Sequence, residues 1–228
     1  RTSAQNANNY FYFRMTGKIE AWHNVMSLYR TNDFATHESV VDYAFARMFL
    51  GCDSLTKAPV FPATTLADSC YWDMFSSCFS LTEAPELPAT TLAVDCCYGM
   101  FRNCRSLVKA PELPATTLAS RCYYQMFSGC QSLTKAPELP ATTLAQSCYV
   151  GMFDGCGSLN EVRCKMPSTI SAGDIPTYTG DGSSTSVPPW LSGVSSTGTF
   201  YTNADANWPS GASGIPENWT VKFIKEWE

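Results

Sequence analysis

The chain has 228 residues, of which 45% are hydrophobic and 15% charged, so it can bury a core and is not disordered by composition. Its 15 Lys and Arg against 20 Asp and Glu give a net charge of -5 without any basic block, which makes nucleic acid a poor partner. No stretch approaches the ~18 consecutive apolar residues of a membrane-spanning helix, and the start lacks both Met and a hydrophobic signal core. We therefore expect a processed, soluble protein with no transmembrane segment.

Residues 1–39 contain two β-prone runs, 9–15 and 19–22, separated by a short Thr-Gly-Lys segment. A hairpin with a glycine turn fits this pattern. We expect it to form an N-terminal β cap that covers the open apolar end of the segment that follows, which accounts for its aromatic content.

From residue 40 the sequence repeats with a period of 26 residues. The pair Met-Phe recurs at this spacing from Met48-Phe49 onwards, and Ala-Pro-Glu-Leu-Pro-Ala-Thr-Thr-Leu-Ala occurs three times without change. The first copy is looser and the last decays towards its end, as end copies of repeat proteins do. A unit this short cannot bury its own apolar face, so about five copies are expected to stack over residues 40–165.

Within one copy, Leu92, Cys96 and Met100 stand at positions i, i+4 and i+8, which predicts a short helix with one buried stripe. Residues 106–113 read as extended, but Pro111 lacks the amide proton that a strand ladder needs, so the strand should be very short. The pattern predicts an α/β repeat solenoid, like a leucine-rich repeat, with short strands and short helices and a β-rich cap at each end.

The consensus Cys-Tyr-x-x-Met-Phe-x-x-Cys-x-Ser-Leu-Thr-x-Ala-Pro covers about residues 40–164 and resembles the BspA-like, Treponema-type leucine-rich repeat of bacterial surface proteins. The tail from Trp190 to Val221 is similar to a segment that often follows such repeats in gut Bacteroidetes and associated phage proteins. The resemblance implies an exported leucine-rich-repeat solenoid that acts in adhesion or partner binding. The Pro-rich strand and longer helical segment depart from the common form of this repeat.

After residue 165 the composition shifts to Gly, Ser, Thr and Pro, which indicates turns or a flexible link. Residues 200–202 and 219–224 read as strands. Residues 166–228 are therefore expected to form a link and a β-rich C-terminal cap, whose exposed terminal strand is able to add to the sheet of a neighbouring subunit.

Nine of the 11 cysteines fall in two columns with the repeat spacing. The columns are Cys52, Cys78, Cys104, Cys130 and Cys156, and Cys70, Cys96, Cys122 and Cys148. They are either buried thiols that act as small hydrophobic groups or a disulfide ladder of an exported protein. Bonds within a copy are disfavoured, because helical residues i and i+8 lie about 12 Å apart, beyond the ~7 Å limit for a bridge. Disulfide bonds between successive copies, of the type Cys52–Cys70, would leave no cysteine of the inner copies unpaired. We nevertheless favour buried thiols.

No metal, cofactor or catalytic site is predicted. The sequence has no Cys-x-x-Cys pair, and its two histidines, His23 and His37, both lie outside the repeats. Gly-x-Ser-x-Gly, Walker and dinucleotide-binding motifs are missing as well. The chain is therefore predicted not to be an enzyme.

Glu86, Glu112 and Glu138 form a column of like charges. Glycoside hydrolysis needs two carboxylates in different surroundings, whereas repetition gives each Glu the same one. We interpret them as solvated edge charges, partly offset by Lys109 and Lys135, with weak Ca2+ binding as the alternative.

Positions that differ between otherwise identical copies are free of the packing constraint and should face solvent. The candidate ligand-binding residues are Trp72, Tyr98, Tyr124, Phe79, Arg105 and Gln131. The first three would form an aromatic row suited to stacking on sugars or anchoring a protein, and local packing of ring against ring is the alternative.

The sequence thus predicts a non-enzymatic extracellular or cell-surface adhesion protein whose repeat surface binds a host or bacterial protein or glycan. One alternative is a structural subunit of an extracellular filament or phage virion, assembled through end-to-end contacts. A second is a carbohydrate-active enzyme, which the missing catalytic motif disfavours.

Overall fold

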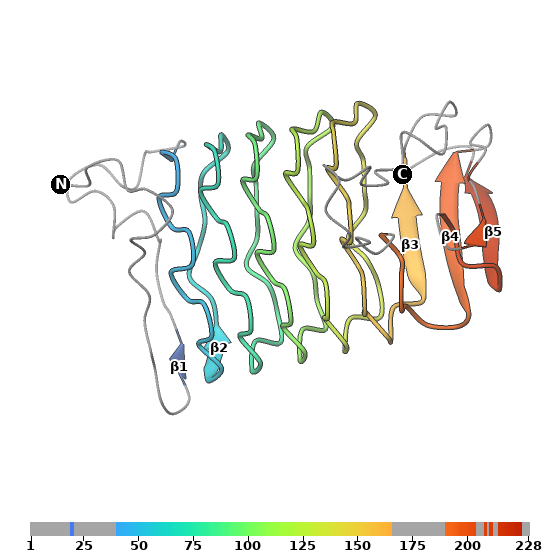
Figure 1. Ribbon diagram of the computed structural model, residues 1–228, viewed down its shortest axis with the longest axis horizontal. Coiled ribbons are helices and arrows are strands. Elements are labelled where there is room, and N and C mark those ends of the chain that lie inside the picture. The colour runs from blue at the N-terminus through green and yellow to red at the C-terminus, as the bar shows by residue number, and fades with distance from the viewer. Residues whose placement is uncertain are drawn as a thin grey trace, which may run out of the picture.

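The computed structural model describes residues 19–20, 40–165, 190–203, 208, 210–211 and 214–224. The strands within these residues are β1 (Ile19–Glu20), β2 (Leu55–Lys57), β3 (Glu161–Cys164), β4 (Gly198–Asn203) and β5 (Trp219–Ile224) (Figure 1). Apart from β1, which pairs in parallel with β2, the predicted N-terminal hairpin lies outside the described residues. His23 and His37 lie outside them too.

Matching segments of successive copies lie side by side (Figure 1). The backbone N–H of Phe45 donates to the carbonyl of Cys70 in the next copy at 2.9 Å, and Phe75 donates in the same way to Met100 at 2.8 Å. On the other side of each copy, isolated parallel bridges such as Glu83 with Lys109 join neighbours. Each copy therefore satisfies part of its backbone through the next one.

The segments predicted to be helical are runs of overlapping β-turns. In residues 41–52 every second N–H donates to the carbonyl three residues back, as Ala46 does to Tyr43 and Met48 to Phe45, both at 3.2 Å. The N–H groups between them point to the next copy. The chain thus alternates between a local bond and a bond to its neighbour, which an α-helix does not do.

The predicted α/β repeat solenoid is wrong. The described residues contain no α-helix, and their largest sheet is small, with three parallel strands in the order β3-β4-β5 that do not close on themselves. Left-handed backbone recurs within each turn run, with φ of 56° at Tyr43, 60° at Arg47 and 69° at Gly51. A helix requires φ near -63°, so these residues exclude one.

The spacing of the buried residues explains the error. Every second turn of the run has a left-handed third residue, so the backbone pattern repeats after four residues and buried Cys96, Met100 and Cys104 recur at that interval. Over two or three turns this spacing imitates the 3.6-residue period of a helix. Runs this short, with this apolar pattern, are therefore compatible with both an α-helix and a series of β-turns.

One ladder of phenylalanine rings runs through the core. Neighbouring rings stack with centroids 5.4 Å to 5.7 Å apart and interplanar angles of 3° to 5°. The ladder consists of Phe49, Phe75, Phe101, Phe127 and Phe153, each at most 3% exposed. Stacked pairs contribute about 0.5–1.5 kcal/mol beyond the burial of their area, so the ladder favours copies in register.

The stack continues past residue 165. Phe153 and Gly155 donate to the carbonyls of Trp190 and Ser192 at 2.9 Å and 2.8 Å, as the earlier copies do to their successors. The strands predicted at 200–202 and 219–224 are confirmed as β4 and β5, and both run parallel to β3. They therefore extend the last copy by two strands.

Candidate binding groove

The predicted aromatic row exists, but its rings mainly contact one another. Trp72 meets Tyr98 edge-on with centroids 6.0 Å apart, and Tyr98 stacks on Tyr124 at 4.6 Å and 11°. Trp72 and Tyr98 are half-buried, while Tyr124 is only 8% exposed. Burial, and then the neighbouring Tyr124, raise the pKa of Tyr98 to about 12. The row thus offers little free ring surface to a ligand.

A buried carboxylate beside the row was missed in the sequence. Asp73 lies between two guanidinium groups, 3.0 Å from Arg102 and 3.6 Å from Arg47, and its side chain is 4% exposed. Arg47 also lies 4.5 Å from the Trp72 ring centroid. Burial raises the pKa of Asp73 although both arginines act to lower it. A Cβ at Gly99 would overlap Oδ1 of Asp73, so this glycine makes room for the carboxylate.

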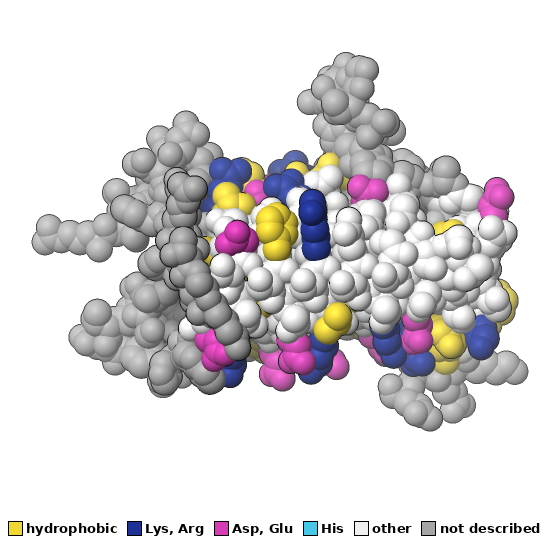
Figure 2. Space-filling model, turned by 90° about the horizontal axis from the view of Figure 1, so that it is seen from below, with side chains coloured by type: hydrophobic (Ala, Val, Ile, Leu, Met, Phe, Trp, Pro, Cys, Tyr) yellow, Lys and Arg dark blue, Asp and Glu magenta, His cyan; other side chains and the backbone are white. Residues whose placement is uncertain are grey.

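The other three candidate residues lie on the surface. Phe79 is 40% exposed, with the Arg105 guanidinium 5.2 Å from its ring centroid, and Gln131 is exposed. Seen from below, the middle of the molecule is mostly backbone and side chains that are neither charged nor hydrophobic (Figure 2). The structure therefore brings Phe79 and Arg105 together on the surface.

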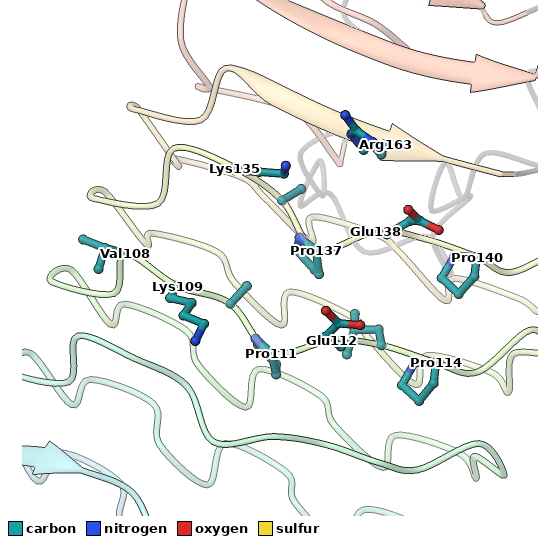
Figure 3. A pocket seen from close by; sticks show the side chains of 13 residues that line it. Val108, Lys109, Pro111, Glu112, Pro114, Lys135, Pro137, Glu138, Pro140 and Arg163 are labelled. Atoms are coloured by element: carbon teal, nitrogen blue, oxygen red, sulfur yellow. The ribbon is translucent and has the colours of Figure 1, made fainter. Parts of the chain in front are cut away.

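A groove lies on the strand side of the third, fourth and fifth copies. Its volume is about 590 Å³, and its lining comes from residues 108–114, residues 135–140 without Leu139, and Arg163 (Figure 3). Pro111 and Pro137 occupy the same position in successive copies and are buried. Proline fixes the backbone, so the two segments repeat with closely similar geometry.

Charged side chains flank these prolines. Two are neutralised by residues of the next copy: Lys135 lies 3.1 Å from Glu161, and Glu138 lies 2.6 Å from Lys165. Arg163 also contacts Glu161, at 3.2 Å. Burial alone would raise the pKa of Glu161, but hydrogen bonds from Lys135 and Arg163 hold it below its usual value.

Lys109 and Glu112 differ from their counterparts in the next copy. Both line the groove and are exposed, and neither forms an ion pair within the described residues. The sequence-based interpretation, in which Lys109 and Lys135 offset the glutamate column, is thus replaced by pairing of Lys135 with Glu161 and of Glu138 with Lys165. Among the residues that the structure describes, Lys109 and Glu112 are thus a cation and an anion of the same copy that line the groove without an ion pair.

All 11 cysteines are free and buried. In one column four of the five thiols donate to the carbonyl of a phenylalanine in the preceding copy, as Cys104 does to Phe75 at 3.1 Å and Cys156 to Phe127 at 3.0 Å. Burial, as the largest cause, raises the pKa of both thiols to about 12. The cysteines therefore belong to the core and lie away from the groove.

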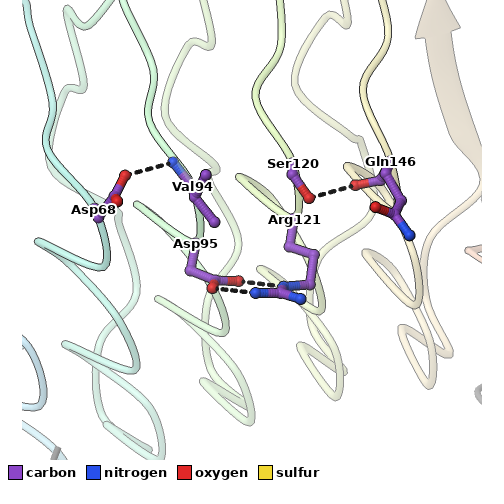
Figure 4. A network of polar contacts seen from close by, with 6 residues as sticks. All are labelled: Asp68, Val94, Asp95, Ser120, Arg121 and Gln146. Atoms are coloured by element: carbon purple, nitrogen blue, oxygen red, sulfur yellow. Dashed lines mark hydrogen bonds and ion pairs between the residues drawn. The ribbon is translucent and has the colours of Figure 1, made fainter. Parts of the chain in front are cut away.

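Polar contacts between copies line one edge of the stack (Figure 4). Asp68 accepts a bond from the Val94 N–H at 3.0 Å, and the Ser120 hydroxyl donates to the Gln146 carbonyl at 3.3 Å. Between them, Arg121 makes two 2.7 Å bonds to Asp95, a bidentate pair. These contacts set the alignment of neighbouring copies.

Within the described residues, no group of three or more His, Cys, Asp and Glu side chains is placed to hold a metal ion. The same part of the chain has no helix that is long and apolar enough to cross a membrane. No family model matches the chain, and neither a curated protein nor a solved structure matches it.

Proposed function

We propose that this chain is a non-enzymatic binding protein that acts outside a bacterial cell, and that the groove of residues 108–114 and 135–140 is its recognition surface. The observation that carries the proposal is this groove, which spans three copies and has a volume of about 590 Å³. Ligand sites usually fall between about 300 and 1,000 Å³. The resemblance to BspA-like surface proteins supports export and adhesion.

The positions of the titratable side chains with shifted pKa values favour a binding function over a catalytic one. Catalytic sites usually bring groups with shifted pKa values to a cleft. Here the thiols and tyrosines whose pKa burial raises most, such as Cys130, Tyr123 and Tyr149, are at most 2% exposed. None of these three lines the groove, whose charged groups are lysine, arginine and glutamate side chains.

An array of surface proteins and glycans, probed with the folded chain, tests the proposal. We expect capture of a protein or glycan that decreases in the variant Lys109→Met/Glu112→Gln, because both side chains project into the groove. The control variant Phe79→Ser/Arg105→Gln changes the exposed pair outside the groove and should bind like the wild type. Capture that depends on Phe79 and Arg105 instead of the groove would refute the assignment.

A structural subunit is the second candidate function, and β5 favours it. Core-facing side chains are fully buried in β3 and β4, as Val162 and Phe200 are at 0% exposure, but their neighbour in β5, Val221, is 40% exposed. Phe223 is 57% exposed. Within the described residues β5 has a partner strand on one side only, so this end of the stack offers an open edge to a second copy.

A further inference from the structure

The fold places two rows of like charge along the groove. Lys109 and Lys135 hold the same position in successive copies, and Glu112 and Glu138 do the same. Neighbouring parallel strands lie about 4.8 Å apart, and like charges that face each other across strands are unfavourable. The two glutamates are therefore unfavourable neighbours, whereas the two lysines lie between Glu83 and Glu161, which β-bridges join to them from the preceding and the following copy.

Only part of this repulsion is relieved within the described residues. Glu161 neutralises Lys135, and Lys165 neutralises Glu138, both from the next copy. Lys109 and Glu112 lack such partners. A ligand that brings one negative and one positive group to these two residues would supply the ion pairs that they do not form within the described residues.

The spacing of the free charges defines the width of this ligand. Lys109 and Glu112 are three residues apart along an extended segment, a distance of roughly 10 Å. They lie on either side of Pro111, and the next copy repeats the order lysine, proline, glutamate (Figure 3). The groove thus has a basic side, an apolar middle and an acidic side.

The prolines decide how a ligand is held. Pro111, Pro114, Pro137 and Pro140 have no N–H to donate. Addition of a strand to this surface would lose those hydrogen bonds. Recognition must therefore come from side-chain charges and from contact with the exposed Pro114 and the half-buried Pro140.

We propose that the groove binds an extended peptide in which acidic and basic side chains alternate, an inference that rests on the proposed function. Successive side chains of an extended chain point to opposite sides. A peptide lying along the groove places an acidic side chain against Lys109 and a basic side chain against Glu112, while Lys135 and Glu138 keep their partners Glu161 and Lys165. This match of charge gives specificity, and salt weakens it because the groups are exposed.

Fluorescence anisotropy with a labelled peptide of alternating Glu and Lys tests this proposal, with poly-Glu and poly-Lys peptides of equal length as comparisons. The alternating peptide should bind most tightly, and its binding should weaken as salt is raised. Lys109→Met and Glu112→Gln should each weaken it about threefold, the usual size of an exposed ion pair, and the double variant about tenfold. Lys222→Glu, outside the groove, should bind like the wild type.

The two proposals fail in different ways. Equal or tighter binding of poly-Glu or poly-Lys, or no binding of the alternating peptide, overturns the ligand class. If array capture still depends on Lys109 and Glu112 in that case, the groove remains the recognition surface. If neither peptide nor array binding responds to these variants, both proposals fall. Circular dichroism of each variant verifies that it is folded.

Discussion

At the scale of single residues, the buried thiols couple the stability of the fold to pH. Cys104 and Cys156 are 0% exposed and donate to backbone carbonyls of the preceding copy. A thiolate there would lose its solvation and that hydrogen bond. The folded core therefore favours the neutral thiol, whereas an unfolded chain ionises it freely.

We predict that the free energy of unfolding decreases as pH rises above about 9. Burial raises the pKa of Cys104 and Cys156 from 9.0 to about 12. A group whose pKa is raised by folding stabilises the fold below its unfolded pKa, and this stabilisation is lost as pH rises through the folded value. Urea unfolding between pH 7 and pH 12, followed by circular dichroism, measures the loss.

The variant Cys104→Ala separates the thiols from other titrating groups. It removes one thiol, so its stability should decrease less between pH 9 and 12 than that of the wild type. At pH 7 the variant should be less stable than the wild type, because it lacks a buried sulfur atom that packs in the core. A pH dependence identical to that of the wild type would mean that Cys104 does not contribute.

At the scale of elements, the turn run depends on a left-handed residue at every fourth position. Asp95, Gly99 and Asn103 in the third copy have φ of 55°, 57° and 61°. Glycine and asparagine adopt this conformation most readily, and they fill four of the five positions of one column, as Gly51, Asn103, Gly129 and Gly155, with Ser77 as the fifth. In the sequence, this column of glycine and asparagine was the feature that indicated a series of turns and not an α-helix.

We predict that Gly99→Ala lowers the free energy of unfolding by about 2–5 kcal/mol. Left-handed backbone costs an L-residue about 1–2 kcal/mol, and overfilling a packed site adds about 1–3 kcal/mol. The second contribution arises because the new Cβ overlaps Asp73. Urea unfolding gives the value.

Two glycines serve as matched controls. Gly51 has φ of 69° but open space around its Cβ position, so Gly51→Ala should show the backbone cost alone. Gly157 has neither constraint, and Gly157→Ala should change stability by less than about 0.5 kcal/mol. Equal losses for Gly99→Ala and Gly51→Ala would show that the contact with Asp73 carries no weight.

The sequence predicted part of this organisation. Periodicity identified the columns that meet between copies, including both cysteine columns and the order of Trp72, Tyr98 and Tyr124, because identical positions meet when copies lie side by side. It did not give the helix-free backbone, since a four-residue period resembles a helix over short runs. Nor did it give the groove, whose free charges depend on which lysine and glutamate pair across copies.

At the scale of the whole molecule, β5 determines how two chains can meet. If two β5 strands pair antiparallel around a two-fold axis, one register that keeps the apolar side chains on one face places Val221 opposite Val221 of the other copy and Phe223 opposite Trp219. In this register Lys222 faces Thr220 and no like charges meet, whereas the register that pairs Val221 with Phe223 brings Lys222 against Lys222 and is unfavourable. Paired in the first register, the two edges would close a dimer, whereas a head-to-tail contact would grow into a filament.

We predict that the molar mass measured by light scattering rises from that of a monomer to that of a dimer as the protein concentration is increased. Val221→Lys and Phe223→Lys should each shift the mass towards the monomer, since a charge would enter the new apolar contact. Val60→Lys, at a residue 59% exposed elsewhere, is the control. Open-ended growth would favour the filament, and a monomer at every concentration would exclude β5 as an interface.

The contact of Asp73 with Gly99 also bears on how the chain avoids misalignment. Near-identical copies invite slippage, because a chain with one copy looped out would still line up its phenylalanines and cysteines. In that arrangement Asp73 would face Gln125, whose side chain fills the space that Gly99 leaves open. Different residues at equivalent positions therefore make the misaligned stack less stable than the native one.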